Sequence, residues 1–296
     1  MYNSVEELLE RAKTENKRLH EVIAQNEMSI SDISEEMLYD RLEKHYQTMV
    51  ASAAKAVNAP QDMPGVDFIK GQSLKQAQYS ESQTLGGSYL NNIMTMALSC
   101  CEVNAGMGRI CAAPTAGACG ILPAVLIETS RKLNSTKKEI LDALLVAAGF
   151  GAIFVRNSTV SGAEGGCQAE CGSAAAMAAA ALVYLEGGNP QQCADAAAFA
   201  LMNLLGLVCD PVSRSLSCGR NSRHVRKRGC HCRHELYGTH LRPRGGTCSG
   251  SVQFSQRKSG GKRRRERGPC PCGAGQHYST RRSNRGNVQG WQKDGA

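Results

Sequence analysis

The sequence predicts an all-α protein, in which a Gly- and Ala-rich helical domain is preceded by a two-helix arm and followed by a disordered tail. Three observations predict this fold class. Apolar residues recur at spacings of three and four in the first 212 residues, runs of β-branched alternation are almost absent there, and helix-capping residues begin several of the periodic segments. We expect the arm over residues 1–58, the main domain over 66–212 and the tail over 213–296.

The charge and the apolar content of the chain both change after Val212. The whole chain has 35 Lys and Arg against 26 Asp and Glu, a net charge of +9. Residues 1–212 hold 15 against 23 (net −8), which leaves 20 against 3 (net +17) for residues 213–296. Only seven of the last 84 residues are Leu, Ile, Val or Phe, too few to form a core. We therefore expect a disordered tail, and any electrostatic case for nucleic-acid binding applies to the tail alone.

The arm is predicted to contain two amphipathic helices. The first follows a capping box that begins at Ser4, and its apolar spacing continues to about Gln25. The second begins near Ser31 or Ser34. Residues 59–65 contain two prolines and predict a linker between the arm and the main domain.

Capping signals also define the helices of the main domain. A second capping box at Thr136 opens a helix that Gly149 can stop. A further helix is predicted over residues 173–185. Asn189 and the proline after it supply an N-cap and a first-turn proline for a helix that runs to about Leu205.

The start of the chain and its apolar runs bear on cellular location. Residues 1–10 are acidic and lack the basic and then apolar stretches of a secretory signal, so we expect a cytoplasmic protein. The longest apolar stretch, residues 174–185, is far shorter than the ~20 residues of a membrane span, so no membrane association is predicted. Eight of the 14 cysteines precede residue 213, and in a reducing compartment they favour metal binding or catalysis over disulfides.

Gly-rich segments between the predicted helices carry candidate chemistry. Residues 109–120 lead into an apolar helix, where Gly and Thr can donate hydrogen bonds to a carboxylate. The alternative is that the Gly and Pro residues only mark the start of that helix. Residues 157–172 place Cys167 and Cys171 before another apolar helix, where the helix dipole favours a thiolate suited to metal binding or nucleophilic attack. The alternative is two small cysteines buried in an Ala-rich packing region. The segment 209–212 (Cys-Asp-Pro-Val) indicates little by itself.

Three motifs in these segments together resemble a known family. Pro-Thr-Ala-Gly at 114–117, Glu-Gly-Gly-Cys-Gln at 164–168 and Cys-Asp-Pro-Val at 209–212 are similar, in order and separation, to the α subunit of the bacterial iron–sulfur L-serine dehydratases. The similarity runs through essentially all of residues 1–212. It implies an oxygen-sensitive 4Fe–4S cluster in place of pyridoxal phosphate, L-serine as the substrate, and a separate β subunit as the partner.

The resemblance also assigns roles to individual residues. Cys167 and Cys209 match two of the three cysteines that hold the cluster, while Thr115 and Gly117 belong to the loop implied to cradle the substrate carboxylate. In the implied mechanism an open iron site polarises the substrate hydroxyl as a Lewis acid while a base removes the α proton. No catalytic base is identified in this chain. No lysine before residue 213 lies in an evident Schiff-base motif, so we expect no pyridoxal phosphate.

The resemblance breaks after Val212. The family continues with Ala-Gly-Leu-Val-Glu, an apolar residue and Pro-Cys, which places the third ligand where this chain has Arg220. Cys218 lies close by, but its neighbours do not match the motif. We hypothesise that residues 213–296 are a frameshifted reading of the family's C-terminal segment. Codons for the Ser-Arg-Ser at 213–215, read one nucleotide later, can encode the expected Ala-Gly-Leu.

A second hypothesis describes a non-catalytic helical protein whose basic tail binds nucleic acid. Twenty basic residues with Tyr237, Phe254, Tyr278 and Trp291 among them could bind RNA or DNA without specificity. A solvated run of charge without such a role is the favoured interpretation, and no specific nucleic-acid partner is expected. The tail cysteines and histidines lack the paired Cys-x2-Cys spacing of a zinc site.

Overall fold

The computed structural model describes residues 2–64, 69–79, 83–204, 242–243 and 252–253. Within these ranges the regular structure is helical apart from two antiparallel two-residue strands, which confirms the all-α fold class. The elements are α1 (Val5–Thr14), α2 (Leu19–Ser31), α3 (Glu35–Asn58), α4 (Gln72–Ala77), α5 (Gly87–Ala105), the 3-10 turn η2 (Ala116–Ala118), α6 (Ile121–Leu133), α7 (Lys137–Asn157), α8 (Gly162–Leu185), α9 (Pro190–Leu204), β1 (Arg242–Pro243) and β2 (Val252–Gln253). Except for the two strands, the tail for which disorder was predicted lies outside the described residues.

The first predicted helix is two helices. Ser4 begins α1 as expected, with its Oγ accepting a hydrogen bond from the Glu7 amide at 3.1 Å. The chain then turns after Thr14, where Asn16 adopts a left-handed backbone conformation with φ 49°. Arg18 restarts the helix, and its amide donates to the Glu21 carboxylate at 2.6 Å. The continuous apolar spacing hid this turn because the apolar residues on both sides of it enter the same core.

The N-caps of the later helices are confirmed. The Oγ of Ser34 accepts from the Met37 amide at 3.3 Å at the start of α3. The Oγ1 of Thr136 accepts from the amide of Glu139, whose side chain accepts in return from the Thr136 amide, at the start of α7. The Oδ1 of Asn189 accepts from the Gln192 amide at 2.9 Å in the first turn of α9.

The prediction that Gly149 stops a helix is wrong. Helix α7 continues through Gly149 and Gly151 to Asn157 and forms the centre of the main core. A Cβ at Gly149 would lie 2.8 Å from Cγ1 of Ile23, and one at Gly151 would lie 2.8 Å from Cε of Met177. These glycines therefore serve the close approach of α2 and α8 to α7, and the ordinary helical hydrogen bonds carry the helix past them.

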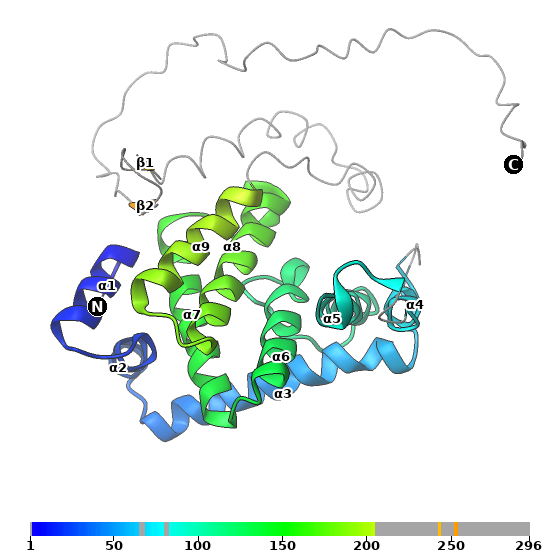
Figure 1. Cartoon of the computed structure of the whole chain (residues 1–296), viewed down its shortest axis with the longest axis horizontal. Coiled ribbons are helices and arrows are strands. Elements are labelled where there is room, and N and C mark those ends of the chain that lie inside the picture. The colour runs from blue at the N-terminus through cyan, green and yellow to red at the C-terminus, as the bar shows by residue number, and fades with distance from the viewer. Residues whose placement is uncertain (1, 65–68, 80–82, 205–241, 244–251, 254–296) are drawn as a thin grey trace, which may run out of the picture. The chain divides into compact units, whose positions relative to one another are not determined.

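Small residues on α8 allow several helices to pack closely around it. Its buried residues include a series of alanines, and α8 lies against α6, α7 and α9 (Figure 1). Helix α3 extends from α7 to α5, so residues of the predicted arm share one buried core with the main domain (Figure 1). None of the helices in the described ranges is both long and apolar enough to span a membrane.

A buried polar chain ties the first helices to α7 and α8. The Tyr184 hydroxyl and Nδ1 of His20 share a hydrogen bond of 2.7 Å. Nε2 of His20 lies 3.7 Å from Oδ2 of Asp142, whose Oδ1 accepts a 2.5 Å hydrogen bond from the Tyr39 hydroxyl. Burial lowers the pKa of His20, and nearby Arg18 lowers it further, although Asp142 opposes both.

The buried polar network around His20 predicts that part of the protein's folding stability is lost at acidic pH. Because the pKa of His20 is lower in the folded than in the unfolded protein, the folded state binds fewer protons below about pH 6.5 and loses stability as the pH falls. We expect the urea midpoint to fall between about pH 8 and pH 5, and to fall less in His20→Gln. The exposed His45→Gln is the matched control. Equal pH slopes for the wild type and His20→Gln would contradict this account.

Candidate active site

The loop between α5 and α6 contains the predicted substrate residues and is fixed at both ends. Nδ2 of Asn104, near the end of α5, donates to the Ala116 carbonyl at 3.1 Å. At the other end Gly120 caps α6, where an added Cβ would lie 2.6 Å from the Ala97 carbonyl oxygen. Only glycine fits this contact between α5 and the start of α6. The loop thus enters and leaves along a defined path.

Thr115 and Gly117 both face the carboxylate of Glu170 on α8. The Thr115 hydroxyl donates a hydrogen bond to Oε1 of Glu170. A Cβ on Gly117 would lie 2.8 Å from the Glu170 carboxyl carbon, so a side chain there would collide with the carboxylate. Thr115 and Glu170 are half-buried and Gly117 is exposed, which leaves this contact accessible from solvent.

The second candidate segment is mostly helical, contrary to the loop that the sequence predicts. Helix α8 begins at Gly162, with the Ser161 side chain accepting from the Ala163 amide. It is interrupted at Gly166, whose φ of 72° and ψ of −179° are non-helical. Glycine adopts this conformation without a Cβ clash. Cys167 is therefore the first residue of the second segment of α8, and its side chain is exposed.

The cysteines before Cys167 lie on α5 and in the loop, where Cys100 and Cys119 are buried and Cys101 and Cys111 are half-buried. Burial raises the pKa of Cys100 to about 11, and that thiol lies 3.5 Å from the Ser52 hydroxyl. A hydrogen bond from Cys119 lowers the pKa of Cys101 to about 7, while the same bond raises the pKa of Cys119. Cys100 thus matches the packing interpretation of a buried thiol. Cys101 on α5 and Cys119 in the loop instead form a hydrogen-bonded pair.

The structure brings together some of the predicted site residues and leaves others apart. Thr115 and Gly117 meet at Glu170, which lies three residues after Cys167 in a continuous helical segment. Residues spaced by three share a helix face, so Cys167 and the loop contact border the same region. Cys209 lies outside the described residues. In the part of the chain that the structure describes, no three His, Cys, Asp or Glu side chains are placed to hold a metal ion.

Glu170 and Asn104 are the residues that sequence reasoning missed. Glu170 lies within the segment singled out at 157–172, but its partner Thr115 is 55 positions away in the chain. No local pattern reports such a contact. The available signal was the acidic residue three positions after Cys167, which becomes informative once the segment is known to be helical.

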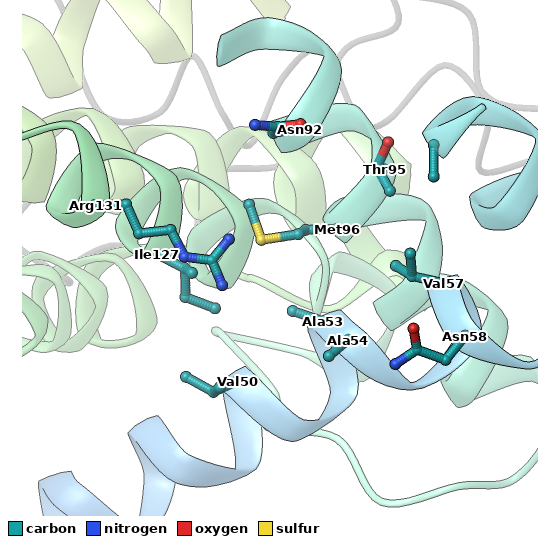
Figure 2. Close-up of a pocket in the computed structure, with 11 residues that line it drawn as sticks. Val50, Ala53, Ala54, Val57, Asn58, Asn92, Thr95, Met96, Ile127 and Arg131 are labelled. Carbon is teal, nitrogen blue, oxygen red and sulfur yellow. The ribbon is translucent and has the colours of Figure 1, made fainter. Parts of the chain in front are cut away.

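A separate cavity of about 290 Å³ lies between α3, α5 and α6 (Figure 2). Its wall is largely apolar, with Met96 beside the Arg131 side chain, Ala53 below them and Asn92 at the upper edge of the view (Figure 2). The Arg131 guanidinium is 3.5 Å from Oε2 of Glu128, and the side chain is 64% exposed. Because none of its lining residues belongs to the loop or to α8, this cavity is distinct from the candidate site.

Comparison with known proteins gives consistent matches. The family described as "Serine dehydratase alpha chain" matches residues 14–221, ending shortly after the Val212 boundary. "Probable L-serine dehydratase, alpha chain" of Bacillus subtilis (strain 168) is 38% identical over 214 residues, which cover 72% of this chain and 71% of that protein. "L-serine dehydratase, alpha chain" of Peptoniphilus asaccharolyticus is 39% identical over 214 residues, covering 72% and 73%.

A longer protein matches over the same share of this chain. "L-serine dehydratase 1" of Escherichia coli (strain K12) is 36% identical over 218 residues, which cover 72% of this chain but 47% of that protein. The matched part therefore corresponds to about half of the longer relative. With the family profile covering most of the described residues and two relatives matched over more than two thirds of their length, the chain belongs to the serine dehydratase alpha chain family.

Proposed function

We propose that this chain is the α subunit of an L-serine dehydratase that converts L-serine to pyruvate and ammonia. The observation that carries the proposal is the 38–39% identity, over 72% of the chain, to two proteins named L-serine dehydratase, alpha chain. In the reaction L-serine loses its α proton and its β hydroxyl as water. The resulting aminoacrylate tautomerises and is hydrolysed to pyruvate and ammonia.

The loop with Thr115 and Gly117 forms one wall of the proposed substrate site. Asn104 and Gly120 fix the path of this loop. A substrate site requires its binding groups to be held in position before the substrate arrives. The absence of a side chain at Gly117 lets the exposed loop backbone lie directly against the Glu170 carboxylate. A catalytic base is not assigned to this chain.

A 4Fe–4S cluster is proposed to be held by Cys167, Cys209 and a third cysteine. Cys167 suits this role because its thiol is exposed and begins a helical segment, where the dipole favours the thiolate that binds iron. When bound, the cluster would supply Lewis-acid assistance to loss of the hydroxyl. The described residues supply only this one ligand, so the proposal also requires residues beyond them.

A separate β subunit is the proposed partner. Two relatives are named as alpha chains, and the match to the longer Escherichia coli protein covers only 47% of its length. The remainder of that single chain has no counterpart in the matched part of this one. A β subunit that corresponds to it would complete the site.

The tail is proposed to replace the family's C-terminal segment through a frameshift. The family match ends at residue 221, and the alignments leave more than a quarter of both this chain and its relatives unmatched. With Arg220 in the third ligand position, this chain is expected to hold the cluster poorly and to have little activity.

Anaerobic reconstitution tests this proposed function. The chain is mixed with its β subunit, iron and sulfide, and pyruvate formation from L-serine is measured. We expect weak activity that needs both the β subunit and iron. Absence of pyruvate even from a chain with the third cysteine restored would overturn the proposal. Full activity with a stable cluster in the 296-residue chain would instead show that Cys218 or another thiol replaces the missing ligand.

A further inference from the structure

The Glu170 carboxylate is a negative charge at the proposed substrate loop. Its Oε1 accepts from the Thr115 hydroxyl, and the backbone of Gly117 passes so close that no side chain could stand there. Gly162 lies on α8 as Glu170 does, and an added Cβ there would lie 3.3 Å from the same carboxyl carbon. Three segments of chain are thus shaped around this one group.

This charge has no cationic partner in the described part of the protein. No lysine, arginine or histidine there lies within 4.0 Å of the Glu170 carboxylate. Thr115 occupies one of the roughly four acceptor positions of the carboxylate, so others can receive hydrogen bonds from a ligand. A half-buried carboxylate held in place in this way is suited to bind a cation that enters from solvent.

We propose that Glu170 binds the α-ammonium group of the substrate and thereby selects amino acids over hydroxy acids. This inference rests on the proposed function, in which the substrate is L-serine. An ammonium has three donors and a positive charge, which complement the open acceptor positions of the carboxylate. A hydroxy acid such as glycerate brings a carboxylate without the ammonium, so Glu170 repels it and gains no ion pair. Repulsion of the wrong ligand and attraction of the right one act together.

The position of Glu170 on α8 connects this selection to the proposed cluster ligand. Cys167 and Glu170 are three residues apart in a segment that begins directly after the break at Gly166. Their side chains are therefore neighbours on one helix face, with Cβ atoms about 5–6 Å apart. A substrate whose ammonium contacts Glu170 would hold its remaining atoms between the loop and Cys167.

Equilibrium binding to the full chain tests the proposal without requiring turnover. Titration calorimetry compares L-serine with glycerate, in which a hydroxyl replaces the ammonium. The wild type should prefer L-serine, and Glu170→Gln should lose about 10- to 100-fold of this preference because a charged hydrogen bond is removed. Glu170→Asp, which keeps the charge but retracts it, should lose part of the preference. The matched control is Glu186→Gln at the far end of α8, which should bind as the wild type does.

Three results would overturn the proposal: a wild type that does not prefer L-serine, a folded Glu170→Gln with unchanged preference, or a parallel loss of affinity for both ligands. If circular dichroism shows that Glu170→Gln is unfolded, an unchanged preference for L-serine in Glu170→Asp would overturn the proposal as well. Failure of the proposed function gives a different pattern. In that case the chain binds L-serine through Glu170 but forms no pyruvate with the β subunit.

Discussion

Replacement of Cys167 by serine is expected to abolish iron binding and to lower pyruvate formation by more than about 100-fold. Residues that hydrogen-bond to a metal ligand without touching the metal typically contribute about 10- to 100-fold to metal affinity or activity. Cys167 is proposed to be a ligand itself, so its replacement should have a larger effect. The thiolate at the head of the second segment of α8 cannot be replaced by a hydroxyl, because iron–sulfur clusters require soft thiolate ligands. Iron content and pyruvate formation are measured after anaerobic reconstitution with the β subunit.

Cys171→Ser is the matched control for this variant. Cys171 lies four residues further along the same helix and is half-buried, whereas Cys167 is exposed. We expect this control to retain iron and activity. Loss of iron in Cys171→Ser with retention in Cys167→Ser would contradict the ligand assignment and would place the cluster on the other cysteine.

Restoring the family's reading frame after Val212 is expected to raise both iron binding and activity by more than about tenfold. The restored segment would supply the third cysteine at position 220, and metal affinity depends on the number of deprotonated ligands that the fold presents. The gene is sequenced first, since the prediction requires a nearby single-nucleotide shift that encodes Pro-Cys. Iron content, melting temperature and pyruvate formation are then compared between the two chains.

A chain that ends at Val212 is the control for restoration. If the basic tail merely interferes, its deletion should raise activity as much as restoration does. We expect deletion to raise neither iron content nor activity, because it supplies no ligand. Equal gains from deletion and restoration would contradict the missing-ligand explanation.

A smaller effect is expected at Gly117. Its Cβ in Gly117→Ala would lie 2.8 Å from the Glu170 carboxyl carbon, so the carboxylate must move away from Thr115. We expect a loss of about 1–3 kcal/mol in the free energy of unfolding, and recovery of most of it in the double variant with Glu170→Ala. Gly172→Ala is the control, since its Cβ would meet only Leu201 and Leu204 at ordinary contact distances. An unchanged loss in the double variant would contradict the steric explanation.

Local chemistry predicted the ends of helices better than their continuity. The caps at Ser34, Thr136 and Asn189 were found because each depends on residues within one turn. Gly149 was interpreted as a stop because local sequence does not reveal that Ile23 packs against it. Asn16 gave no strong turn signal, because apolar spacing continues on both sides of it.

At the candidate site, too, residues in local sequence motifs were predicted, whereas a contact that depends on the tertiary fold was not. The family resemblance drew attention to Thr115, Gly117 and Cys167, and all three border the region around Glu170. Glu170 itself could not be found, since its contact with Thr115 depends on how the loop packs against α8. The helical character of residues 162–172 was also missed, because four glycines there lower helix propensity while packing in the protein stabilises the helix.

The iron dependence of pyruvate formation tests the central claim most directly. The frame-restored chain and its β subunit are purified anaerobically, and pyruvate formation from L-serine is measured as iron and sulfide are removed and returned. We predict that activity disappears with the iron, returns with iron and sulfide in equal amounts, and needs no pyridoxal phosphate. Activity that persists without iron in a protein with the visible absorbance of bound pyridoxal phosphate would contradict the account.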